Sequence, residues 1–337
     1  MNQAKSSIAG PVYRAGGPSP RGLRYVAAWL VVGMLFGASG SLLAMETRDG
    51  SSIPARLAPQ SLLLDAVAVN GGIWAVGERG HLLFTSDRCR TWRQVQVPTR
   101  AMLTGITFYD DRLGWAVGHD AVILRTADGG ESWQKVYEAP DDFQPLLDVW
   151  FKDALHGFAI GAYGLCLRTR DGGLHWEAMR ISEDEWHLHH MAQSKNGRLY
   201  IAAEAGQIYR SDDGGDTWIT LPSPYNGSFF GVLPLEQDAL IVYGLRGHVF
   251  GSEDAGDTWH PIPTDTVATL ACGLLLSDGR ILLAGLKGSV LIGREKNTFL
   301  ATVPGLGRRG VWAVLQISPQ EILCFGEGGA VRLDIDK

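Results

Sequence analysis

The sequence predicts an all-β fold, a seven-bladed β-propeller with Asp-box turns, on two observations. A tight turn between two apolar runs recurs seven times at intervals of 41 to 43 residues. A period of this size with four short strands per unit is typical of propeller blades. The residues that end the seven turns are Gly80, Ala121, Gly164, Gly206, Gly247, Gly288 and Gly329. In the first five repeats, the turn is followed by the Asp-box pattern Ser/Thr-x-Asp-x-Gly-x-Ser/Thr-Trp or a weaker copy of it.

The Asp box predicts the turn between the third and fourth strands of a blade. Its carboxylates are Asp87, Asp128, Asp171, Asp213 and Asp254, and its tryptophans are Trp92, Trp133, Trp176, Trp218 and Trp259. We expect each carboxylate to accept N–H groups of its own loop and each Trp to fill the space between neighbouring blades. We interpret the motif as structural and not catalytic, because it lies at the rim, away from the channel where propeller sites usually form.

The third repeat shows the four strands of one blade. Apolar and β-branched runs at 147–151, 157–160, 165–169 and 176–180 are separated by Gly and Asp turns, which is the strand pattern. The seventh repeat supplies only three runs before the chain stops. We therefore expect an N-terminal strand at 52–57 to pair with the last blade and close the ring, the alternative being a ragged seventh blade.

The chain begins with a predicted leader at residues 1–45. A basic flank without acidic residues precedes 25–45, which is uncharged, so the protein is expected to be exported to a periplasm or lumen. Two outcomes stay open: a cleaved signal peptide, or an N-terminal membrane anchor. A polar linker with the closing strand is expected at 46–60, and the propeller at 61–337.

The charge of the exported part argues against nucleic acid as a partner. Four of the 30 Lys and Arg lie in the leader, so 26 remain against 36 Asp and Glu, a net charge near −10. Nucleic-acid binding favours a basic face instead. The four cysteines have no C-x-x-C spacing, and we interpret them as buried thiols, with disulfides as the alternative.

Three sets of residues are candidates for function. Arginines recur on the third strand at Arg125, Arg168 and Arg210. His187, His189 and His190 lie on an inner strand, and we expect channel-lining side chains there rather than a metal site. The two variable residues inside each tight turn should all emerge on one face, where fixed scaffolds usually carry binding specificity. Among them, Arg79, Tyr163, Arg246 and Lys287 predict a partly basic arc for a partner.

The repeated pattern, as in 114–133 and 157–176, resembles the photosystem II stability/assembly factor family and its relatives in non-photosynthetic bacteria. This resemblance covers about residues 60–337. It implies an exported or lumenal seven-bladed propeller without known chemistry that binds membrane-protein intermediates. It also implies an arginine-rich contact patch, to which Arg125, Arg168 and Arg210 correspond here. In bacterial relatives, it implies an association with membrane exporters.

We therefore expect a non-enzymatic, membrane-associated scaffold or assembly factor that binds a membrane protein complex. It should be a monomeric propeller without catalytic residues, cofactor or metal, and a small-molecule or glycan ligand is not expected. The alternative is a sialidase-like glycoside hydrolase or carbohydrate-binding propeller. That alternative requires Arg, Tyr, Glu and Asp side chains to converge at the channel mouth.

Overall fold

The computed structural model describes residues 50–69, 71–295, 298–300 and 305–335, without the side chains of 294, 295 and 298–300. The chain divides into two compact units, 1–48 and 49–337, and every described residue belongs to the second. The predicted leader at 1–45 lies outside the described residues and stays a prediction. Within the described ranges, no helix has the length and apolar character needed to cross a membrane.

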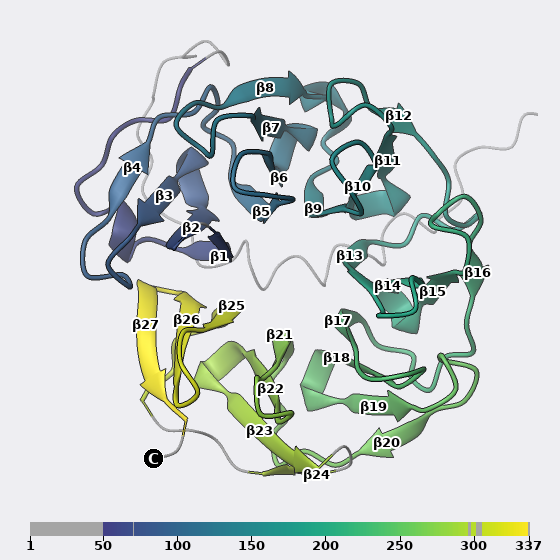
Figure 1. The fold of residues 1–337 in the computed structure, drawn as a ribbon. Coiled ribbons are helices and arrows are strands. Elements are labelled where there is room, and N and C mark those ends of the chain that lie inside the picture. The colour runs from purple at the N-terminus through teal and green to yellow at the C-terminus, as the bar shows by residue number, and fades with distance from the viewer. Residues whose placement is uncertain (1–49, 70, 296–297, 301–304, 336–337) are drawn as a thin grey trace, which may run out of the picture. The chain divides into compact units, whose positions relative to one another are not determined.

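The described unit is a ring of seven antiparallel sheets around a central axis, as predicted (Figure 1). In the first blade the strands run outward in chain order as β1 (Leu63–Val69), β2 (Gly72–Gly77), β3 (Leu82–Thr85) and β4 (Arg93–Val95). Blades 2 to 4 contain β5 (Leu103–Phe108), β6 (Gly114–Gly118), β7 (Ile123–Thr126), β8 (Gln134–Tyr137), β9 (Leu146–Phe151), β10 (Gly157–Gly161), β11 (Cys166–Thr169), β12 (Glu177–Ala178), β13 (Leu188–Gln193), β14 (Leu199–Ala203), β15 (Ile208–Ser211) and β16 (Ile219–Thr220). Blades 5 to 7 contain β17 (Phe229–Pro234), β18 (Leu240–Gly244), β19 (Val249–Ser252), β20 (His260–Ile262), β21 (Leu270–Leu275), β22 (Ile281–Gly285), β23 (Val290–Glu295), β24 (Thr298–Leu300), β25 (Val311–Gln316), β26 (Glu321–Gly326) and β27 (Gly329–Asp334).

The apolar core lies between neighbouring blades. Every residue of the second strand of blade 2, β6, is buried, because this strand is covered on both faces. Aromatic side chains fill the contact with blade 3, where the rings of Trp115 and Phe151 stack with centroids 3.4 Å apart. Burial of such large apolar side chains is the main stabilising term of the ring.

Tight turns join the second and third strands at one face of the ring, which we call the turn face. In the first turn, η3 (Glu78–Gly80), Arg79 is left-handed with φ 57°. Gly80 follows with φ 68°, and a Cβ there would overlap the carbonyl oxygen of Thr99 in the link to the next blade. This close approach explains why the turn so often ends in Gly. The other turns are η4 (His119–Ala121), η6 (Ala162–Gly164), η7 (Glu204–Gly206), η8 (Leu245–Gly247) and η9 (Leu286–Gly288).

The predicted closing strand at 52–57 is not formed, and the seventh sheet has three strands in the described residues. Ser52 instead bonds to blade 1, where its N–H donates to the Val97 carbonyl at 2.8 Å and its hydroxyl accepts the Val97 N–H. Pro54 has no N–H to donate to a ladder, which also disfavours a strand here. The ring closes through η2 (Ala58–Gln60), whose Pro59 carbonyl lies so close to Gly329 of the last blade that a Cβ there would overlap it.

All four cysteines are free thiols. Cys166 and Cys324 are buried in strands, and Cys89 and Cys272 are partly buried. Burial raises the pKa of the Cys166 and Cys324 thiols to about 12, so these groups stay protonated and pack as small apolar side chains.

Candidate binding surface

The Asp-box carboxylates are bound within their own loops. Asp128 accepts the N–H of Ser132 at 3.0 Å, the Ser132 hydroxyl at 2.5 Å and the Thr126 hydroxyl at 2.7 Å. These hydrogen bonds lower the pKa of Asp128 to about 2. Asp171 and Asp213 accept equivalent bonds, which also lower their pKa values to about 2. A carboxylate held in this way stabilises its loop and is poorly placed to exchange protons with a substrate.

The Asp-box tryptophans lie between their own blade and the preceding one. Trp133 donates from Nε1 to the Gly130 carbonyl at 3.2 Å and packs edge-on against Phe108 and Trp74. The equivalent rings Trp92, Trp176, Trp218 and Trp259 contact the inter-blade apolar clusters in the same way. The motif thus joins consecutive blades as well as two strands of one blade.

The third-strand arginines connect each blade to the Asp box of the next. Arg125 donates from Nε to the Gly172 carbonyl at 2.8 Å, and Arg168 pairs with Asp216 at 3.0 Å. Arg210 donates to the Ala255 carbonyl and pairs with Asp257, both at 3.0 Å. These contacts give the three arginines a role in stability. Their predicted role in partner binding stays a prediction.

The predicted arc residues occupy one equivalent position in their turns. Arg79, Tyr163, Arg246 and Lys287 have φ values of 57°, 55°, 58° and 58°, and all four side chains are exposed. Left-handed backbone is costly for residues other than Gly, Asn and Asp. The first residue of each turn donates its N–H to the carbonyl just before an inner strand, as Glu78 does to Leu62 at 3.2 Å. The turns and the inter-blade links therefore share the turn face.

The histidines predicted to line the channel are fixed by hydrogen bonds. His187 Nδ1 accepts the N–H of Tyr163 at 2.8 Å, and its Nε2 lies 3.7 Å from a Glu204 carboxylate oxygen. His189 Nδ1 lies 2.8 Å from the Phe229 carbonyl, and burial lowers the pKa values of His189 and His190 to about 4. In the described part of the chain, no three His, Cys, Asp or Glu side chains are grouped to hold a metal ion.

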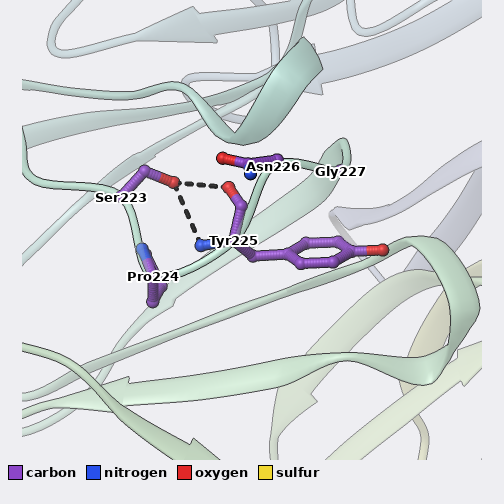
Figure 2. Close-up of a pocket in the computed structure, with 5 residues that line it drawn as sticks. All are labelled: Ser223, Pro224, Tyr225, Asn226 and Gly227. Atoms are coloured by element: carbon purple, nitrogen blue, oxygen red, sulfur yellow. Dashed lines mark hydrogen bonds between the residues drawn. The ribbon is translucent and has the colours of Figure 1, made fainter.

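Aromatic side chains that the sequence reasoning missed lie next to the turn of blade 5, where His248 follows η8. The Tyr225 ring lies 4.3 Å from the His248 ring and 6.1 Å from the Phe229 ring. Figure 2 shows the loop that carries Tyr225, with the Ser223 hydroxyl bonded to the Tyr225 carbonyl at 2.7 Å. This loop, 223–227, lines an open hollow of about 420 Å³. The sequence contains a signal for this loop, because the link between blades 4 and 5 carries an aromatic residue, Tyr225, between Pro224 and Asn226.

Two carboxyl groups on inner strands join neighbouring blades. Asp65 accepts the N–H of Ile106 in blade 2 at 2.8 Å, and Asp148 accepts the N–H of Met191 in blade 4 at 2.8 Å. Desolvation by the surrounding protein raises the pKa of each carboxyl to about 7. The sequence reasoning missed both, although aligning the Leu-Leu-Asp runs of repeats one and three would have revealed their equivalence.

Comparisons with known proteins follow the repeat pattern. The family model described as "Photosynthesis system II assembly factor YCF48" matches residues 84–144 and 136–297. The chain is similar to the chloroplastic photosystem II stability/assembly factor HCF136 of Cyanidioschyzon merolae. The two are 35% identical over 96 residues, and the matched segment makes up 27% of this chain. That match spans only about a fifth, 21%, of the relative's length.

Two solved structures have the same fold. The structure titled "YCF48 bound to D1 peptide" is similar with a TM-score of 0.64 at 17% identity, over 87% of this chain and 96% of that one. The structure of YCF48 from Cyanidioschyzon merolae is similar with a TM-score of 0.68 at 14% identity, over 84% of this chain and 98% of that one. At these identities the likeness concerns the fold.

Proposed function

The chain belongs to the photosynthesis system II assembly factor YCF48 family, and from this premise we propose that it is an exported, non-enzymatic assembly factor. It acts as a monomeric scaffold that binds an extramembrane segment of a membrane protein complex through its turn face. The YCF48 structure solved with a D1 peptide supports a peptide segment as the kind of partner. In a photosynthetic host the partner would be a photosystem II intermediate, and in another host an exporter.

The observation that carries this proposal is the backbone of the turns. Six of the seven turns hold a residue other than Gly at the central left-handed position, and three of those residues are Arg or Lys. Gly would avoid a cost of about 1 kcal/mol at such a position, so an exposed long side chain gains nothing for the fold. Strain retained at an exposed site, repeated around one face, supports a role of these side chains in binding.

The third-strand arginines are a second contact surface in this proposal. Arg168 and Arg210 are largely occupied by the next blade, with side chains 22% and 13% exposed. A partner could replace or share these carboxylate contacts only at a cost in stability. We therefore assign the first contact with the partner to Arg79, Tyr163, Arg246 and Lys287.

The experiment is capture from native membranes. A C-terminally tagged chain is crosslinked mildly, isolated, and compared with a variant that combines R79E, Y163A, R246E and K287E. The expected result is one membrane protein recovered in stoichiometric amount with the wild type and at least about tenfold less with the variant. The matched control is Lys195→Glu, because Lys195 is 71% exposed in a loop on the opposite face.

Both variants must show the wild-type unfolding midpoint before capture is compared. Equal recovery with the turn variant and the wild type would place binding elsewhere on the ring. An empty capture with the wild type would reject a stable membrane partner.

A further inference from the structure

Charged side chains are segregated on the turn face. A basic sector over blades 5 to 7 and 1 consists of Arg246, Lys287, Arg308, Arg309, Arg79 and Arg100. An acidic sector over blades 2 to 4 consists of Asp120, Asp141, Asp142, Glu183, Asp184 and Glu185. Both sectors use the same positions of the repeat, namely the centre of the turn and the link that follows about 20 residues later. Equivalent positions thus carry opposite charges in the two halves of the ring, and the repeat alone does not produce the division.

The links between blades bring both sectors to this face. Gly288 of a turn lies so close to the Gly307 carbonyl that the loop with Arg308 and Arg309 is held beside η9. In the acidic sector, a Cβ on Gly164 would lie 3.3 Å from the Glu185 Cα, which places the 183–185 loop beside η6. The Asp120 carbonyl accepts the N–H of Ala139 at 2.9 Å, which joins η4 to the loop that holds η5 (Pro140–Asp142).

Each sector keeps its sign after its internal counter-charges are considered. The basic sector contains three carboxylates, Glu78, Asp265 and Glu327, against its six cations. The acidic sector contains a pair of Arg180 with Glu183 at 3.0 Å and a pair of Lys135 with Glu138 at 2.7 Å. In the first pair Arg180 offsets one of the six carboxylates, and in the second Lys135 offsets Glu138, which is not one of the six. The sector therefore stays acidic.

The channel opens between the sectors, where five of the seven bulge residues of the inner strands are apolar and the other two are Thr104 and His189. Each inner strand has a β-bulge just after its first residue, at the turn-face end of the channel. The bulge residues include Leu64, Leu147, Phe230 and Trp312, and all four are only partly buried. A partner that crosses the face from one sector to the other therefore passes apolar side chains in the middle.

We propose that the partner is an extended peptide segment with its charges segregated: an acidic end on the basic sector, an apolar middle over the channel mouth and a basic end on the acidic sector. This inference rests on the proposed function and adds the partner's chemistry to it. Complementary charge accelerates association and like charge rejects wrong partners, so the divided face also fixes the direction of the bound segment.

The test uses the full exported chain and three fluorescent synthetic peptides. The segregated peptide has three aspartates, a Leu-Phe-Leu centre and three lysines. The mixed peptide has the same residues with alternating charges, and the acidic peptide has serines in place of the lysines. We expect anisotropy titrations to show the segregated peptide binding about tenfold or more tightly than the mixed one at low salt, with the difference shrinking as salt screens the charges.

Variants assign the ends. D184K combined with E185K should weaken the segregated peptide about tenfold and leave the acidic peptide unchanged or tighter, whereas R246E combined with K287E should weaken both. Equal affinities for segregated and mixed peptides would overturn the inference. If the two peptides bind equally but the membrane capture still depends on the turn residues, the proposed function stands and only the inferred charge pattern of the partner is rejected. A preference for the segregated peptide with an empty membrane capture would instead reject the proposed function.

Discussion

Arg125 Nε lies 2.8 Å from the carbonyl oxygen of Gly172, in the Asp box of the next blade, and Trp115 Nε1 donates to the same oxygen at 3.1 Å. The Asp box is thus an acceptor for the preceding blade as well as a turn of its own. Arg168 and Arg210 make the equivalent contacts one and two blades further on. Because each contact joins residues more than 40 positions apart, these side chains couple the blades mechanically around the ring.

Arg125→Ala should therefore destabilise the ring modestly. The Gly172 oxygen keeps its bond from Trp115, so the expected loss is about 1 kcal/mol in the free energy of unfolding and not the larger cost of an orphaned buried carbonyl. Urea unfolding measures it. Arg170→Ala is the matched control, because Arg170 is 60% exposed and pairs with Asp216 only at the surface. Equal midpoints for the two variants would show that the Arg125 contact contributes nothing.

Gly173→Ala should cost much more than Gly197→Ala, although both glycines are left-handed. Gly173 has φ 79°, and a Cβ there would overlap Nε1 of Trp115, whereas Gly197 has φ 91° and open space around the Cβ position. The backbone strain is common to both and costs about 1 kcal/mol. Overpacking against the buried indole adds roughly 1–3 kcal/mol at Gly173 alone. Comparable unfolding midpoints for the two variants would contradict the packing argument.

The inner-strand carboxyls predict a fall in stability as pH rises. The folded-state pKa of Asp65 and Asp148 is raised from 3.8 to about 7, so the folded protein holds these protons more tightly than the unfolded chain does. Their contribution is full below pH 4 and is lost as pH rises through 7. The slope approaches about 1.4 kcal/mol per pH unit for each group.

Asp65→Asn and Asp148→Asn should each flatten this slope, as measured by urea unfolding at pH 4, 5.5 and 7. Each carboxylate accepts a second N–H, from Ala66 at Asp65 and from Val149 at Asp148, both at 2.8 Å. Absolute stability is not the readout, because an amide oxygen can replace only one of these two contacts. Asp128→Asn is the control: the folded pKa of Asp128 is lowered to about 2, so its titration changes the stability only below about pH 4 and the slope between pH 4 and 7 should stay as in the wild type. If Asp65→Asn and Asp148→Asn both keep the wild-type slope, other groups cause the fall in stability with pH.

The repeat pattern was sufficient to predict the number of blades and the order of their strands, because the same local requirements recur in every unit. Gly80 and its equivalents are needed where a turn touches the link to the next blade. The glycine and the turn lie within one repeat, so the sequence of a single repeat is enough to predict them. The closure was mispredicted because 52–57 lies outside the repeat register and its partner, Val97, is specified only by the fold. Likewise, the acceptors of Arg125, Arg168 and Arg210 lie in the following repeat. The spacing of residues along the sequence does not show that these groups are in contact, so the hydrogen bonds could not be predicted.

Protonation of His187 should loosen the turn of Tyr163. The Nδ1 atom must stay unprotonated to accept the Tyr163 N–H, and burial lowers the pKa of His187 below 6.5. The contact is therefore present above pH 6.5 and is lost as pH falls through the folded pKa, where Glu204 favours the charged ring. Amide hydrogen exchange of Tyr163 should show protection at pH 7 that decreases toward pH 5. His187→Asn retains an acceptor without titrating, and its protection should not change over this range.

Ring closure predicts which N-terminal residues the fold needs. Ala58 is 1% exposed and packs in one cluster with Leu323 and Phe325 of the last blade, while the Pro59 carbonyl covers Gly329. A chain that starts at Ser51 should unfold like a chain that starts at Glu46, the first residue after the predicted leader. A chain that starts at Ser61 should lose amide protection in β27 and β1 first, because the edge that η2 covers becomes accessible. Gly329→Ala should reproduce this local loss without truncation. Unchanged protection of β27 in both variants would mean that blade 7 is held by its neighbours alone.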